Sequence, residues 1–193
     1  MYKIAVLAST NGTDLQAIID EVEAGTLKVE ISGLFTNRSK CGAVAKAEKA
    51  GIPVFAFKSK GKSREIFDTE MIEKLRELKV DLIVLVGYMR ILSDKFVQAF
   101  PNRIINVHPS LLPKFAGGMD TNVHEEVLAA GEKETGCTIH IVNEEVDGGK
   151  ILCQKTCPVF PDDTPETLKK CVQDLEKKWY PRIIQDFADG KIL

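Results

Sequence analysis

The stretch "VDLIVLVG" at residues 80–87 decides the fold class. Apart from one aspartate, every residue before the closing glycine is apolar. A strand with one face in water would alternate apolar and polar residues, so an unbroken apolar run indicates a strand buried on both faces. Such strands are typical of parallel sheets that are covered by helices on both sides.

Further apolar runs alternate with helical patterns along the first two thirds of the chain. Strands are expected at 3–8, 29–37, 53–57 and 103–108, in addition to 80–87. Helices are expected from residue 13, at 42–51, around 67–78 and at 94–100. This alternation predicts an α/β fold with a doubly wound, mostly parallel Rossmann-like sheet and helices on both faces.

The pattern changes in the last third of the chain. The strand-like runs 136–145 and 149–160 have no helix between them, so they are expected to add antiparallel strands near the C-terminal end. A final helix is expected to begin with Thr164 as N-cap and Pro165 as its first residue. We expect residues 1–193 to form one domain.

Composition favours small-molecule chemistry. Lys and Arg number 26 against 28 Asp and Glu, and the net charge of -2 gives no general attraction to nucleic acid or to an anionic membrane. No apolar run approaches the length of a membrane span or a signal-peptide core, so a cytoplasmic location is expected. Five cysteines without paired metal-ligand spacing predict reduced thiols and no metal.

The stretch "INVHPSLLPK" at residues 105–114 is the first candidate site. Ligands of open parallel sheets bind beyond the carboxyl ends of the strands. Asn106 and His108 lie two positions apart in a strand, so they project to one face, and Pro109 ends the strand there. An amide beside an imidazole is suited to binding a developing oxyanion, although a purely structural pair is equally compatible with this pattern.

The other two histidines are weaker candidates for acid–base chemistry near neutral pH. His124 lies beside two glutamates in "NVHEEVL", so it is expected at the surface. His140 lies in an alternating strand on the face opposite its isoleucine neighbours. It either lines the cleft or is a hydrogen-bonded, partly buried histidine.

Two further loops are expected at the same edge of the sheet. The loop 9–14, "STNGTD", is neither a dinucleotide nor a Walker A motif. Its glycine and free N–H groups could hold one phosphate, or it is an ordinary turn in which Thr13 or Asp14 caps the helix. In "VDGG", Asp147 could raise the pKa of a histidine, or it is an ordinary acidic turn residue.

Taken together, "NVHPSLLP" and "VDGG" resemble the formyltransferase family that uses 10-formyltetrahydrofolate. The segments "NGTDLQAIID", "SREIFD", "GYMRIL" and "FADGKIL" extend this resemblance over essentially the whole chain. They are most similar to the members that formylate glycinamide ribonucleotide in de novo purine biosynthesis. The resemblance implies 10-formyltetrahydrofolate as co-substrate, no metal, glycinamide ribonucleotide and folate as partners, and a monomer or homodimer.

The same resemblance implies three groups of site residues. The catalytic group consists of Asn106, His108 and Asp147. The group expected to hold the phosphate and ribose of the substrate consists of Gly12, Thr13, Asp14 and Glu176. The folate-binding group consists of Arg64, Met89, Arg90, Ile91, Leu92 and Asn106.

This chain departs from the family pattern at three places. Asp14 stands where asparagine is commoner, and a carboxylate repels a phosphate unless it points away. Thr10 stands where glycine is usual, and the segment 114–127 is longer than the corresponding family loop. Contacts of that segment are therefore not transferred to this chain.

The expected reaction is direct attack of the amine on the formyl carbon, giving a tetrahedral adduct. Asn106 and protonated His108 would stabilise its oxyanion, and Asp147 would hold the imidazolium. One alternative is a formyltetrahydrofolate deformylase, in which water is the acceptor. A non-catalytic folate- or nucleotide-binding module is the other, but such a protein would not need an acid–base set.

Overall fold

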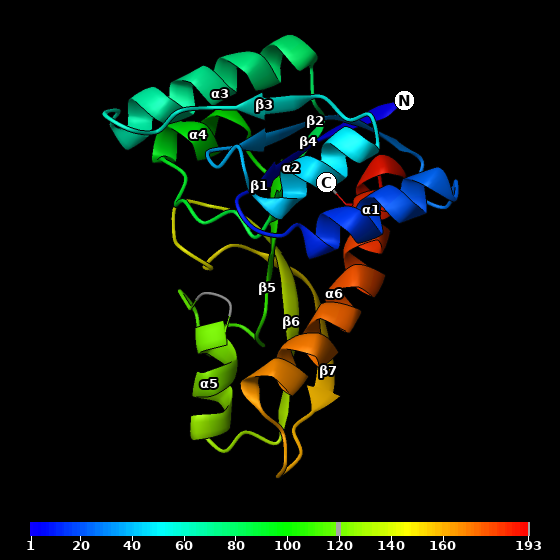
Figure 1. The fold of residues 1–193 in the computed structure, drawn as a ribbon, viewed down its shortest axis with the longest axis vertical. Helices are drawn as coiled ribbons and strands as arrows, with labels where there is room; N and C mark the ends of the chain where they lie inside the picture. The colour runs from blue at the N-terminus through cyan, green and yellow to red at the C-terminus, as the bar shows by residue number, and fades with distance from the viewer. Residues whose placement is uncertain (119–120, 193) are drawn as a thin grey trace.

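The computed structural model describes residues 1–118 and 121–192, which form a seven-stranded sheet with helices on both sides (Figure 1). The strands are β1 (Tyr2–Ala8), β2 (Val29–Thr36), β3 (Val54–Ala56), β4 (Leu82–Val86), β5 (Ile104–His108), β6 (Glu134–Ile141) and β7 (Ile151–Pro158). The helices are α1 (Thr13–Glu23), α2 (Gly42–Lys49), α3 (Arg64–Leu78), α4 (Asp94–Ala99), α5 (Thr121–Ala129) and α6 (Pro165–Ala188).

The stretch that predicts the fold forms the central strand β4. All five of its residues are buried, and it pairs in parallel with β1 on one side and β5 on the other. The order β3-β2-β1-β4-β5-β6-β7 reverses direction between β1 and β4. The prediction of a doubly wound parallel sheet is confirmed, and the reversal places a binding crevice at the carboxyl ends of β1 and β4.

Two hydrophobic layers cover the two faces of the sheet. On one face α1, α2 and α6 contribute apolar side chains, including Leu15, Ala43 and Ile184. On the other face α3 and α4 contribute Phe67 and Phe96. Burial of large apolar side chains on both faces is the main stabilising contribution to this architecture.

The last strands are antiparallel, as predicted. β6 pairs with β5 and β7 pairs with β6, both in antiparallel register. The predicted run 136–145 continues past the observed end of β6, because residues 142–150 leave the sheet as a turn. This turn carries Asp147 toward the carboxyl end of β5.

Helix α6 begins where the sequence predicts. The Thr164 hydroxyl accepts a hydrogen bond from the N–H of Thr167, and Pro165 is the first helical residue. Further along, the buried Tyr180 hydroxyl contacts the carbonyl oxygens of Leu85 and Ile105 at 2.9 and 3.0 Å. These contacts fix α6 against β4 and β5. None of the described helices is long and apolar enough to cross a membrane.

Candidate active site

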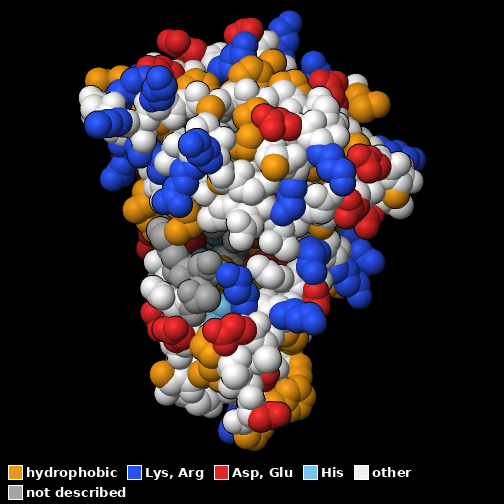
Figure 2. All heavy atoms as spheres, in the orientation of Figure 1, with side chains coloured by type: hydrophobic (Ala, Val, Ile, Leu, Met, Phe, Trp, Pro, Cys, Tyr) orange, Lys and Arg blue, Asp and Glu red, His pale blue; other side chains and the backbone are white. Residues whose placement is uncertain are grey.

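A cavity of about 450 Å³ opens at the carboxyl ends of the central strands. Its lining comes from the loop before α1, the loop after β4, the end of β5, the turn after β6, and α6. Figure 2 shows histidine atoms in a hollow on this face, with basic side chains beside it. The cavity therefore joins the three loops that the sequence singles out.

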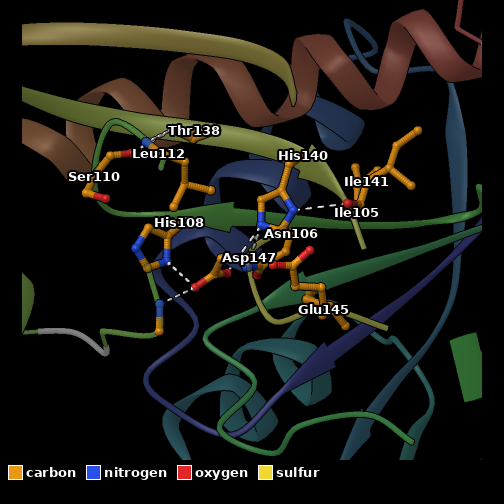
Figure 3. Close-up of polar contacts among 12 residues, drawn as sticks. Ile105, Asn106, His108, Ser110, Leu112, Thr138, His140, Ile141, Glu145 and Asp147 are labelled. Carbon is orange, nitrogen blue, oxygen red and sulfur yellow. Dashed lines mark hydrogen bonds and ion pairs between the residues drawn. The ribbon is translucent and has the colours of Figure 1, made fainter. Parts of the chain in front are cut away.

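The loop after β5 is held firmly against β6. The Thr138 hydroxyl donates to the carbonyl of Ser110 at 2.7 Å and accepts from the N–H of Leu112 at 3.0 Å. All three residues are buried. This anchoring fixes the backbone directly beyond His108 (Figure 3).

Asp147 lies between two imidazole rings (Figure 3). Its Oδ2 is 3.3 Å from Nδ1 of His108, and its Oδ1 is 3.5 Å from Nε2 of His140. The backbone N–H of Gly117 also donates to Oδ2 at 2.8 Å. The structure thus brings Asp147 and His108 together from elements about forty residues apart in the sequence.

The environment of His108 contains opposing influences on its charge. Burial, helped by the neighbouring His140, holds the pKa of His108 below its ordinary value, although the Asp147 carboxylate and the carbonyl of Phe115 act to raise it. Nε2 of the ring lies 2.9 Å from the Phe115 carbonyl, so both ring nitrogens face acceptors. An imidazolium can donate to both acceptors at once, which a neutral imidazole cannot.

Asp147 is suited to remain ionised. Burial by itself would raise its pKa, but hydrogen bonds from His140 and Gly117, with the charge of the histidines, lower it below the ordinary value. A carboxylate that stays negative beside His108 favours the cationic form of the ring.

His140 is a site residue that the sequence leaves undecided. It lies opposite Asn106 in the antiparallel register of β5 and β6, and Nδ2 of Asn106 is 3.3 Å from its Nε2. Its Nδ1 lies 3.0 Å from the carbonyl of Ile141, which orients the ring. Of the two positions that the sequence allows, the structure places His140 in the cavity wall. This placement follows from the register of β6 on β5, which no local pattern in the sequence reveals.

The expectation for His124 is wrong. Its side chain is buried and lines the cavity, although the neighbouring Glu125 and Glu126 are exposed. The glutamates mark the solvent face of α5. The opposite face packs against α6 through Val123 and Val127, and His124 is covered with it.

The loop before α1 is shaped for a close approach of the backbone. Gly12 is the N-cap of α1 with φ 68°, and a Cβ added to it would lie 2.8 Å from Cβ of Ala43. No side chain caps this helix, so the idea that Thr13 or Asp14 caps it is wrong. The first N–H groups of α1 are left available for an anion.

The residues predicted to bind phosphate and ribose lie around this helix start. Thr13 and Asp14 line the cavity, and Glu176 lines it from α6. Asp14 and Glu176 are only 7% and 6% exposed. Gly12 shapes the loop rather than the cavity wall. Their roles in binding stay predictions.

Most residues predicted to bind folate lie in the loop after β4. Met89, Arg90, Ile91 and Leu92 all line the cavity, and half-exposed Ile91 presents an apolar surface to a ligand. The Arg90 guanidinium stacks on the Phe67 ring, with its carbon 4.3 Å from the ring centroid.

Arg64 is the exception within the predicted folate group. It is the exposed first residue of α3 and is not among the residues that line the cavity. The structure therefore does not bring Arg64 together with the others, and its contact with folate stays a prediction.

No group of three or more His, Cys, Asp or Glu side chains that could hold a metal ion occurs within residues 1–118 and 121–192. The segment predicted to differ from the family loop, 114–127, includes residues 119 and 120, which lie outside the described part.

The chain belongs to the formyl transferase family, whose sequence profile matches residues 2–184, and the crevice with Asn106, His108 and Asp147 at its edge agrees with this class. It is 42% identical over 193 residues to phosphoribosylglycinamide formyltransferase of Haemophilus influenzae, covering 100% of this chain and 90% of that protein. The predicted family is thereby confirmed.

Solved structures confirm the predicted fold. Glycinamide ribonucleotide transformylase 1 from Symbiobacterium toebii superposes with a TM-score of 0.94 at 38% identity, covering 98% of this chain and 89% of that one. Phosphoribosylglycinamide formyltransferase from Coxiella burnetii gives a TM-score of 0.93 at 41% identity, covering 98% and 88%.

Proposed function

We propose that this protein transfers the formyl group of 10-formyltetrahydrofolate to the amine of glycinamide ribonucleotide. The products are formylglycinamide ribonucleotide and tetrahydrofolate, as in de novo purine biosynthesis. The observation that carries the proposal is the contact of Asp147 with His108, beside Asn106, at the end of β5. The names of the full-length relatives support the choice of substrate.

The two substrates would approach Asn106, His108 and Asp147 from opposite ends of the cavity. The phosphate is assigned to the start of α1 at Thr13 and Asp14, with the ribose beside Glu176. The folate is assigned to the loop 89–92, whose apolar side chains and backbone groups face the cavity. The formyl carbon and the amine would then meet near Asn106 and His108.

The attack forms a bond from the amine nitrogen to the formyl carbon, and the carbonyl electron pair moves to oxygen. Asn106 and His108 both line the cavity, and we assign Nδ2 of Asn106 and Nε2 of His108 as the donors to this oxyanion. The oxyanion would replace the Phe115 carbonyl, which His108 Nε2 contacts at 2.9 Å. Preorganised donors of this kind typically contribute roughly 10²–10³ in turnover.

Collapse of the adduct breaks the bond from carbon to the folate nitrogen, which leaves with the electron pair. That nitrogen must gain a proton, and the attacking nitrogen must lose one. We assign this transfer to Asp147, which lies against His108 and favours its cationic form, directly or through one water.

We also place this activity in the cytoplasm. All five cysteines are free thiols, which fits a reducing compartment.

The proposal is tested by mixing the protein with 10-formyltetrahydrofolate and following the release of tetrahydrofolate. We expect release to depend strictly on added glycinamide ribonucleotide. Equal release without the amine would contradict the transferase and identify a hydrolase with water as acceptor.

A further inference from the structure

Asp14 is a buried carboxyl group at the place where a phosphate is expected. It is the second residue of α1, it is 7% exposed, and it lines the cavity. Its Oδ1 has no hydrogen-bond partner among the described residues. A buried polar atom without a partner is costly, which points to a partner supplied by a ligand.

The surroundings of Asp14 oppose a negative charge. Burial raises the pKa of Asp14 to about 7, and the Lys177 ammonium on α6 only partly offsets this. Tyr180 on α6 and Cys137 on β6 also lie close enough to interact with it electrostatically, and Glu176 on α6 lines the same cavity. None of these three supplies a positive charge.

Hydrogen bonding from the protein does not relieve this situation. The Tyr180 hydroxyl is already engaged by the carbonyl oxygens of Leu85 and Ile105. On the side of α2, the Lys46 ammonium contacts the carbonyl of Asn11 rather than the carboxyl of Asp14. The unpartnered Oδ1 belongs to a side chain that lines the cavity, so a ligand in the cavity is suited to complete its hydrogen bonding.

We propose that Asp14 binds the phosphate of the substrate as a neutral carboxylic acid, so that substrate binding takes up one proton. The O–H of Asp14 then donates to a phosphate oxygen, and the start of α1 supplies further N–H donors. An ionised Asp14 would instead repel the phosphate. This inference rests on the proposed function, because that function supplies the phosphate-bearing substrate.

The consequence is that the ionisation of Asp14 makes the affinity for the substrate depend on pH. Above about pH 7, each further pH unit should weaken the binding of glycinamide ribonucleotide by up to roughly tenfold, since one proton must be bound with it. In Asp14→Asn the amide donates without needing a proton. The affinity of that variant should follow only the ionisation of the ligand itself.

The experiment measures the dissociation constant of glycinamide ribonucleotide by calorimetry between about pH 6 and about pH 9. The wild type, Asp14→Asn and the control Asp20→Asn are compared, Asp20 being an exposed carboxylate of the same helix. Repeating the titration in buffers of different ionisation enthalpy counts the protons taken up. We expect the wild type and Asp20→Asn to take up close to one proton more than Asp14→Asn at about pH 8.

Identical proton counts and parallel affinity profiles for the wild type and Asp14→Asn would overturn the inference. Where Asp14→Asn fails to fold, the wild-type count is first corrected for the protons that the ligand itself gains or loses, known from its own titration, and a corrected count of zero at about pH 8 overturns the inference. Formyl transfer is assayed on the same samples. Transfer with parallel profiles refutes only the role of Asp14, whereas absence of amine-dependent transfer at every pH refutes the proposed function.

Discussion

Replacing Asp147 with asparagine removes the negative charge beside His108 while keeping the size of the side chain. The amide oxygen can still accept from the N–H of Gly117, which donates to Asp147 at 2.8 Å, so the turn should keep its shape. The variant therefore isolates the charge. In the proposed reaction this charge holds the His108 ring as the imidazolium that meets the oxyanion.

The magnitude follows from the geometry of the pair. At the 3.3 Å that separates Oδ2 of Asp147 from Nδ1 of His108, a pair of unit charges interacts by about 5 kcal/mol at an effective dielectric constant of about 20. The amide dipole of asparagine would recover part of this. A net loss of roughly 3–4 kcal/mol corresponds to a fall of about 10²–10³ in kcat.

The pH profile of kcat shows in which direction Asp147 shifts the pKa of His108. Turnover that needs the imidazolium falls as pH rises through the pKa of His108, and Asp147 acts to raise that pKa. In Asp147→Asn the falling limb should move to lower pH. Steady-state assays across pH check this, with Asp162→Asn, an exposed aspartate in another turn, as the control. A turnover within about threefold of the wild type, with an unmoved limb, would refute the reasoning.

Three further changes test other parts of the site. His108→Ala should lower kcat by roughly 10²–10⁴ while the protein stays folded, as checked by circular dichroism, and near-normal turnover would contradict its role. Gly12→Ala should cost about 1–3 kcal/mol in urea unfolding, because φ is 68° and the methyl group would meet Ala43; an unchanged midpoint would count against this. The pKa of Asp14 rises on folding from 3.8 to about 7, so its stabilising contribution is complete below about pH 4 and is lost as pH rises through about 7. Asp14→Asn should remove this slope, worth at most roughly 4 kcal/mol in unfolding free energy between about pH 4 and pH 8, and parallel pH curves would exclude it.

Local patterns in the sequence predict the fold well, because buried strands and helix starts each require particular residue types at neighbouring positions. The apolar run of β4 can only be a strand covered on both faces, and Thr164 with Pro165 marks the start of α6 by local chemistry. Asn106 and His108 are likewise placed together by the two-residue period of β5. Each of these predictions depends on residues within one element.

The parts that the sequence does not predict depend on contacts between distant elements. His140 meets Asp147 only because β6 pairs with β5 in one register and the following turn folds back over both. His124 is buried because α5 packs on α6, which its glutamate neighbours do not reveal. Asp147 is identified as the partner of His108 by the resemblance to a family. That its carboxylate lies between His108 and His140 is seen only in the structure.

The most direct test of the central claim follows the formyl carbon itself. The protein is mixed with glycinamide ribonucleotide and 10-formyltetrahydrofolate that carries an isotopic label in the formyl group, and the labelled products are identified by nuclear magnetic resonance. Direct transfer at the site of Asn106, His108 and Asp147 predicts one labelled formamide on the nucleotide for each tetrahydrofolate released. Label that appears as free formate while the nucleotide stays unlabelled would contradict the account.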